Sequence, residues 1–112
     1  MTKADSYIPE RGDIVWIDFE PQKGKEIMKR RPALVLSPAK YNRFGLMLCC
    51  PLTTKAKGRP FEVRLPSSPD QAVLSDQVKS FDWRQRRAEL KEQVDPKTVQ
   101  DVIRRIAVLL VE

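Results

Sequence analysis

The sequence PALVLS (residues 32–37) is a continuous apolar run whose length suits a β-strand. Because residues on both faces of the run are apolar, it predicts a central strand that is covered on both sides. We expect Pro32 at the first position of this strand, since proline lacks the N–H that a strand interior uses. The segment directly before it, KEIMKRR (residues 25–31), is rich in charged residues.

Other strand patterns lie on both sides of this run. RGDIVWIDF (residues 11–19) alternates and is rich in β-branched and aromatic residues, which predicts a strand. LMLCCPLT (46–53) predicts another buried strand, and weaker patterns over 61–66, 73–83 and 87–94 predict three more. We expect a long loop over 20–31, a short helical turn over 38–44 and a basic loop over 54–60.

The C-terminal segment predicts an α-helix over about residues 96–110. Asp95 is a strong N-cap residue, and Pro96 suits the first helical position. Apolar residues then recur at helical spacing, namely Val99, Val102, Ile103, Ile106, Leu109 and Leu110. Several short strands and one terminal helix predict a mainly β (α+β) fold, a small antiparallel barrel or strongly bent sheet capped by the helix.

Length and composition predict one globular domain over residues 1–112. The chain is 41% hydrophobic, which argues against disorder. Its apolar stretches are too short to span a bilayer, and the N-terminus lacks the apolar region of a signal peptide, so we expect a cytoplasmic protein that does not enter membranes. The net charge of +6 favours an anionic partner, either nucleic acid or an acidic protein segment. Basic clusters at 23–31, 55–64 and 84–91 suggest one face built from several loops.

Histidine is absent, and the two cysteines are adjacent at Cys49 and Cys50. Neighbouring side chains on a strand point to opposite faces, so we expect no disulfide between them, and a Cys/His zinc site is excluded. Without histidine, Ser-His-Asp and histidine-pair catalysis are excluded as well. Any catalysis must use carboxylates, Arg or Lys, hydroxyls or the backbone.

Four motifs in fixed order resemble the MazF/PemK family of toxins from bacterial toxin–antitoxin pairs: RGDIVWIDFEPQKGKE, RRPALVLSPAKYN, PLTTKAKGRPFEV and LSDQVKSFDW. The likeness covers about residues 9–110. It implies an SH3-like barrel with a C-terminal helix, and a homodimer. It also implies a metal-independent, sequence-specific endoribonuclease without cofactors. Such enzymes cleave single-stranded mRNA to 2′,3′-cyclic phosphate and 5′-hydroxyl ends and inhibit translation. The implied partner is a cognate antitoxin whose acidic, disordered tail crosses the RNA channel, in a larger toxin–antitoxin complex.

The resemblance also implies which residues form the site. The family's catalytic arginine falls on Arg31, its catalytic threonine on Thr53 and its loop glutamate on Glu26. The residues expected to bind RNA are Phe19, Lys29, Arg30, Asn42, Lys55, Lys57, Asp76, Gln77 and Lys79. The plasmid-borne Kid/PemK branch uses a histidine and an arginine where this chain has Lys25 and Leu74, so we do not transfer that branch's mechanism.

These residue types suit RNA transesterification. Arg31 carries a permanent charge on a fork that can bind two phosphate oxygens, and Thr53 can donate a hydroxyl hydrogen bond to the same phosphate. Glu26 stands among four cations that favour its ionised form and lower its pKa, which weakens it as a base. A general base and a structural anchor are therefore both open roles for Glu26. The Trp16 and Trp83 side chains are expected in the core.

Two other functions stay open on the sequence alone. One is a CcdB-like protein that poisons DNA gyrase through its C-terminal helix, and the other is a non-catalytic RNA-binding SH3-like module. The paired Arg31 and Thr53 favour the nuclease, because a gyrase poison has no use for them. The sequence gives neither the RNA word that is cut nor the antitoxin.

Overall fold

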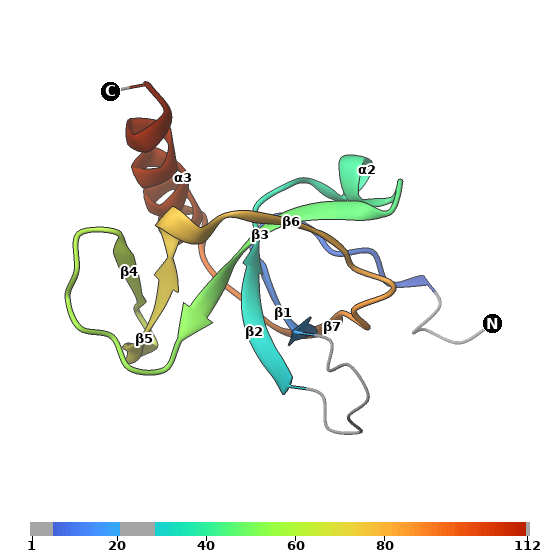
Figure 1. The fold of residues 1–112 in the computed structure, drawn as a ribbon, viewed down its shortest axis with the longest axis horizontal. Coiled ribbons are helices and arrows are strands. Elements are labelled where there is room, and N and C mark those ends of the chain that lie inside the picture. The colour runs from blue at the N-terminus through green and yellow to red at the C-terminus, as the bar shows by residue number, and fades with distance from the viewer. Residues whose placement is uncertain (1–5, 21–28, 112) are drawn as a thin grey trace.

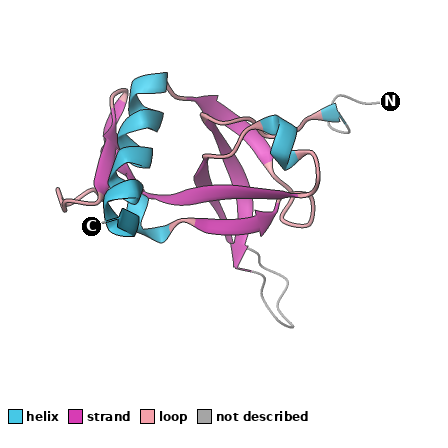
Figure 2. Cartoon of the chain, turned by 90° about the horizontal axis from the view of Figure 1, so that it is seen from above, coloured by secondary structure: helices cyan, strands magenta, loops and turns pink. Residues whose placement is uncertain are grey.

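The computed structural model describes residues 6–20 and 29–111, and Figure 1 shows their arrangement. Strands dominate, and every pairing between them is antiparallel. A long helix ends the chain and runs beside the strands (Figure 2). In chain order the elements are β1 (Asp13–Glu20), β2 (Lys29–Val35), α2 (Ala39–Asn42), β3 (Leu46–Thr53), β4 (Glu62–Leu65), β5 (Ser68–Leu74), the 3₁₀ turn η1 (Ser75–Gln77), β6 (Lys79–Asp82), β7 (Glu89–Gln93) and α3 (Pro96–Val111).

One strongly bent sheet runs in the order β4-β5-β3-β2-β1-β7, and β6 pairs with β3 off this path. The bend lies in β3, which pairs with β6 over its first half, with β2 in its middle and with β5 over its last two residues. Within the described ranges β4 and β7 end the path without pairing to each other, so the sheet is barrel-like but not closed. The predicted SH3-like fold with a C-terminal helix is confirmed.

The central strands are buried on both faces, as predicted from PALVLS. Leu34 joins a core cluster shared with β4, β5 and α3, whereas its neighbour Val35 joins a second cluster around Trp83. Cys50 and Cys49 divide between the same two clusters, and both thiols are free. Adjacent residues of these strands therefore pack into different core clusters, one on each face of the sheet.

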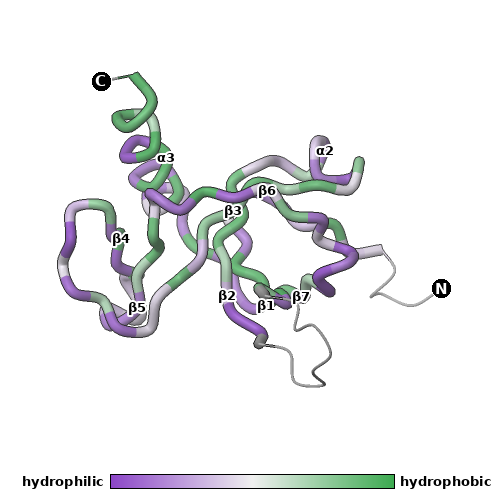
Figure 3. The backbone as a smooth tube through the Cα atoms, in the orientation of Figure 1, coloured by the Kyte–Doolittle hydropathy of each residue, from purple (hydrophilic) through white to green (hydrophobic). Residues whose placement is uncertain are grey.

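Helix α3 begins as the sequence predicts. The N–H of Thr98 donates to the Asp95 carboxylate at 2.9 Å, which supplies the cap, and Val99 and Val102 are buried against the first cluster. The last turns of the helix are apolar but exposed (Figure 3), with Leu110 at 78% and Val111 at 79%.

In the described part of the chain no helix is long and apolar enough to cross a membrane.

The structure corrects three details of the predicted strands. β2 begins at Lys29, so Pro32 is its fourth residue; pairing with β3 starts at Ala33, and the missing N–H removes no bond from that ladder. The pattern over 73–83 breaks at η1, because its first part pairs with β4 and β3 and its second part with the far end of β3. β5 also starts earlier than predicted, at Ser68, because SSPD has the composition of a turn.

Candidate active site

Strands β2 and β3 separate at the end that carries Arg31 and Thr53. Ala33 pairs with Pro51, and extending that register by two residues would set Arg31 opposite Thr53. Among the described strands the β2–β3 pairing ends at Ala33 and Pro51, and the last two residues of β3 pair only with β5, on the opposite edge of β3 from β2. Pro32 and Pro51 stand at the point of separation, and neither has an N–H with which to continue the ladder. The strand ends therefore diverge, and a cavity opens between them.

The cavity has a volume of about 610 Å³ and is lined by side chains from six strands. Its described walls contain four cations and no carboxylate, which suits an anionic ligand. The lining residues are Trp16, Phe19, Arg30, Arg31, Pro32, Pro51, Leu52, Thr53, Thr54, Gln71, Leu74, Gln77, Lys79 and Lys91.

Arg31 and Thr53 both line this cavity. The Arg31 side chain is exposed, and the structure gives it no hydrogen bond or ion pair with any described residue. The Thr53 Oγ1 accepts a hydrogen bond from the Lys55 N–H at 3.1 Å. Because one lone pair of this oxygen is occupied by a donor, the hydroxyl hydrogen is left to donate to a ligand.

The basic loop that follows Thr53 is fixed by hydrogen bonds to a buried carboxylate. Glu62 Oε1 accepts the N–H groups of Lys57 at 2.7 Å and Gly58 at 2.8 Å. Gly58 has a φ of +78°, a backbone conformation that glycine adopts readily. Lys55 and Lys57 are exposed on this loop, beside the cavity but outside its lining.

The predicted RNA-binding residues do not all reach the cavity. Phe19, Arg30, Gln77 and Lys79 line it, whereas Asp76 lines a separate groove with Phe61 and Leu109 beside α3. Lys29 opens β2 opposite Glu20, but its side chain lies outside the described residues. Glu26, the predicted loop carboxylate, also lies outside them.

Asn42 is placed in the interior and away from the cavity. Its side chain is fully buried; Nδ2 donates to the Pro9 and Ser37 carbonyls, and Oδ1 accepts the Ser37 hydroxyl. The Asn42 carbonyl also accepts the Trp83 indole N–H at 2.7 Å. Since these bonds occupy its donors and acceptors, we assign Asn42 to the joint between α2, the N-terminal segment and Trp83, and leave it out of the RNA-binding set.

We predict that Asn42→Ala lowers the free energy of unfolding by about 2 kcal/mol, because the substitution leaves buried carbonyls without donors. Urea denaturation measures this effect. Cleavage assayed well below the unfolding midpoint should keep the parental KM. A KM that rises while stability is unchanged would instead return Asn42 to the binding surface.

Two cavity residues escaped the sequence analysis. Trp16 was expected in the core, but it is 36% exposed and lines the cavity, with the Lys91 ammonium 5.6 Å from its ring centroid. The strand pattern could not show this, because Trp16 shares a face with buried Ile14. Lys91 belongs to the third predicted basic cluster, which was the one available signal.

The thiols and carboxylates limit which chemistry the described site can perform. Burial raises the pKa of both Cys49 and Cys50 to about 12, so both remain protonated near neutral pH. Within residues 6–20 and 29–111, no group of three His, Cys, Asp or Glu residues lies close enough to hold a metal ion. Arginine, lysine and hydroxyl groups are what the described walls offer.

A small SH3-like sheet with a C-terminal helix carries a cationic cavity that Arg31 and Thr53 both line, which suits an anionic ligand. Residues 10–110 match the family of PemK-like, MazF-like toxins of type II toxin–antitoxin systems. The chain belongs to this family.

Individual relatives agree with that assignment. The endoribonuclease toxin MazF of Escherichia coli K12 is 48% identical over 106 residues, which cover 93% of this chain and 96% of that protein. The endoribonuclease toxin ChpB of the same organism is 37% identical and covers 79% and 80%. A crystal structure of MazE–MazF from Deinococcus radiodurans superposes with a TM-score of 0.85 at 48% identity, covering 93% and 96%. Neither the gyrase-poison nor the non-catalytic alternative finds support in these matches.

Proposed function

We propose that the cavity between β2 and β3 is where this chain cleaves single-stranded RNA, at preferred sequences and without a metal ion. The chain is an endoribonuclease toxin of a type II toxin–antitoxin system. The observation that carries the proposed site is the divergence of β2 and β3, which leaves the unpaired Arg31 and the Thr53 hydroxyl at one cationic cavity.

The reaction needs a negative charge to be stabilised on the scissile phosphate. The ribose 2′-hydroxyl attacks phosphorus, the bond to the 5′-oxygen breaks, and a 2′,3′-cyclic phosphate and a 5′-hydroxyl result. Arg31 binds the non-bridging oxygens as charge builds up on them, and the Thr53 hydroxyl donates a second hydrogen bond. Among the described residues Arg31 has no side-chain hydrogen bond or ion pair, and Thr53 Oγ1 accepts one bond while its hydroxyl hydrogen has no acceptor there.

The 2′-hydroxyl must also lose a proton, and the leaving 5′-oxygen must gain one. No described wall residue is a carboxylate, so Glu26 remains the proposed base from the sequence resemblance, with a structural role as the alternative. Lys79 and Lys91 stand in the cavity walls and can neutralise the backbone phosphates on either side.

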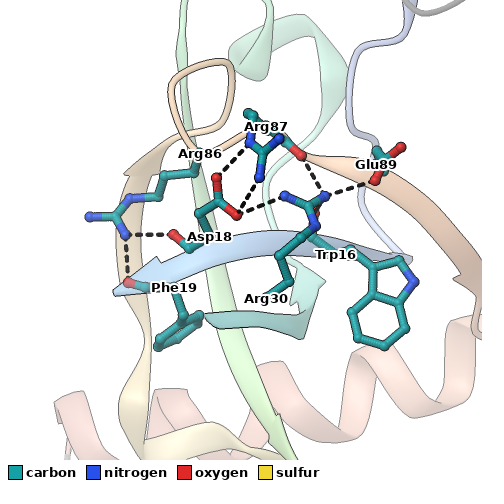
Figure 4. A network of polar contacts seen from close by, with 7 residues as sticks. All are labelled: Trp16, Asp18, Phe19, Arg30, Arg86, Arg87 and Glu89. Atoms are coloured by element: carbon teal, nitrogen blue, oxygen red, sulfur yellow. Dashed lines mark hydrogen bonds and ion pairs between the residues drawn. The ribbon is translucent and has the colours of Figure 1, made fainter. Parts of the chain in front are cut away.

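Trp16 is the proposed platform for a nucleobase. Its indole projects away from the neighbouring charge cluster (Figure 4) and its exposed part lines the cavity. Stacking of a base on an aromatic ring contributes about 1–3 kcal/mol and suits every base. The half-buried Phe19 and the exposed Gln77 line the same cavity and complete a surface that can hold splayed bases.

We predict that Trp16→Ala weakens binding of an uncleavable 2′-O-methyl oligonucleotide about 5- to 100-fold, whereas Trp16→Phe keeps most of the affinity. Fluorescence supplies a second measurement. The parental protein should show quenching on titration, and Trp16→Phe, which retains buried Trp83, should not. Equal affinity of the alanine variant and the parent would remove Trp16 from the site.

The proposed partners follow from exposed features of the same fold. A homodimer would cover the apolar end of α3, where Val108, Leu109, Leu110 and Val111 are 48% to 79% exposed. An antitoxin with an acidic, disordered tail would be attracted to the cationic cavity and would keep RNA out of it, in a larger toxin–antitoxin complex. Two of the similar structures from Deinococcus radiodurans are structures of MazE–MazF. We place the protein in the cytoplasm, where its RNA substrate is.

The test is incubation of the protein with a long single-stranded RNA in EDTA, followed by analysis of the fragment ends. The expected products carry 2′,3′-cyclic phosphate and 5′-hydroxyl ends at a limited set of sequences. Intact RNA under these conditions would refute metal-independent cleavage, and 3′-hydroxyl ends would refute the proposed attack by the 2′-hydroxyl.

A further inference from the structure

A cluster of charged side chains lies at the base of β2, directly beside Arg31. Asp18 on β1 is 3% exposed and pairs in register with Arg30 on β2. Its Oδ1 accepts from Arg30 Nη1 at 2.9 Å, and its two oxygens accept from Arg87 Nε at 2.8 Å and Nη2 at 3.2 Å (Figure 4). The two guanidinium groups, Arg87 first, hold the pKa of the Asp18 carboxyl below its usual range.

Arg30 makes several further contacts within this cluster. Besides Asp18, its Nη2 donates to the Arg87 carbonyl at 2.8 Å, to Glu89 Oε1 at 2.9 Å and to the Trp16 carbonyl at 3.3 Å. These bonds hold the guanidinium against Asp18, Glu89 and two backbone carbonyls, so a phosphate that bound Nη2 would have to replace them. Arg30 lines the cavity with its Nη2 donors bound to protein acceptors, whereas the adjacent Arg31 points to the other face of the strand and has no side-chain partner within residues 6–20 and 29–111.

Arg87 shows how strongly the cluster is held together. Its φ of +53° is unusual for a residue with a side chain, and it is maintained while its guanidinium binds Asp18 and its carbonyl accepts from Arg30. The neighbouring Arg86 fixes the same corner, donating to the Asp18 carbonyl at 3.0 Å and to the Phe19 carbonyl at 2.6 Å. The end of β1 and the start of β2 are thereby tied to the segment before β7.

We propose that the cluster of Asp18, Arg30, Arg87 and Glu89 positions Arg31 and withholds two cations from RNA. The inference rests on the proposed cleavage site. The two carboxylates and two guanidinium groups balance in charge, and the buried Asp18 would lose one of its two guanidinium partners if either arginine turned to a phosphate. Arg31 is thus presented to the substrate beside an arginine that cannot compete for the phosphate.

Removing the Asp18 charge should release both arginines toward RNA. We expect Asp18→Asn to lower kcat for cleavage about tenfold or more, because Arg31 loses its fixed neighbour. Binding of an uncleavable 2′-O-methyl oligonucleotide should instead become more salt-dependent, by about 0.7 in the log–log slope for each new phosphate contact to a single strand. In the double variant Asp18→Asn/Arg30→Gln, the log–log slope should move part of the way back to the parental value. A purely structural role would lower the melting temperature without changing the slope.

The controls separate this proposal from general charge and from folding. Asp70→Asn changes the net charge by the same amount at an exposed position and should leave the slope and kcat unchanged within about twofold. Arg30→Gln alone decides the matter even if Asp18→Asn fails to fold, as checked by circular dichroism. An unchanged slope supports a withheld Arg30, and a slope reduced by about 0.7 means that Arg30 already contacts phosphate and overturns the proposal.

Failure of the proposed function would look different. If the parental protein neither binds nor cleaves RNA, the site assignment fails before any variant is compared. If the parent cleaves RNA but folded Asp18→Asn keeps the parental kcat and salt slope, the cluster has no positioning role, and the cleavage site stands.

Discussion

Replacing Arg31 by alanine should reduce the cleavage rate about 100- to 1,000-fold, the loss typical of removing one preorganised donor from a developing anion. The side chain is exposed, faces the cavity and has no partner among the described residues, so its charge is fully available to the phosphate. For the same reason the substitution should change the free energy of unfolding by about 0.5 kcal/mol or less. Single-turnover cleavage and thermal unfolding measure the two effects.

Arg31→Lys is the matched control for this prediction. It keeps the positive charge but replaces a planar fork by a single ammonium, so part of the rate should return while most stays lost. If the Arg31→Ala variant cleaved RNA at the parental rate, another group would have to stabilise the phosphate. If lysine fully restored the rate, charge rather than the two-point geometry of the guanidinium would be what matters.

Loss of the Thr53 hydroxyl is the second large effect that we expect. Thr53→Val keeps the shape and the β-branch of the side chain but cannot donate to the phosphate, and should slow cleavage about 10- to 100-fold, as for a hydrogen bond to a charged group. It also removes the acceptor of the Lys55 N–H, which orders the first residue of the basic loop. Single-turnover rates at saturating RNA separate the loss in the chemical step from any loss in binding.

Thr53→Ser isolates the hydroxyl from the methyl group. Serine can accept from the Lys55 N–H and donate to the phosphate, so its rate should stay within about threefold of the parent, the difference reflecting its freer rotamer. A serine variant as slow as valine would mean that packing of the methyl group, and not the hydroxyl, makes this position important. A valine variant at the parental rate would remove Thr53 from the chemistry.

The helices and strands that could be predicted are those whose sequence signals lie within the element itself. Asp95 and Pro96 fix the start of α3, and the apolar run after Arg31 marks a doubly buried strand, because each pattern is read within one element. The separation of β2 from β3 is not local. Two prolines hint at it, but the pairing partner of the last residues of β3 is β5, some twenty residues further along the chain.

The site was predictable in part for the same reason. The family motifs point to Arg31 and Thr53 as the proposed catalytic pair, but no local pattern distinguishes Arg31, which has no partner among the described residues, from the neighbouring Arg30. Their difference arises from Asp18, Arg87 and Glu89, which lie 12 to 59 positions from Arg30 and meet it through tertiary pairing. Asn42 was misjudged likewise, because its partners Pro9 and Trp83 come from distant segments.

The two prolines at the point where β2 and β3 separate affect what can bind in the cavity. A gap between two strands invites an extended chain to insert as an additional strand through main-chain hydrogen bonds. Pro32 and Pro51 remove two N–H donors from the floor of this gap. A protein segment lying there must therefore be held through its side chains. Recognition would then depend on charge and be sensitive to salt, as expected for RNA, so that the proposed antitoxin tail and the substrate would compete on the same terms.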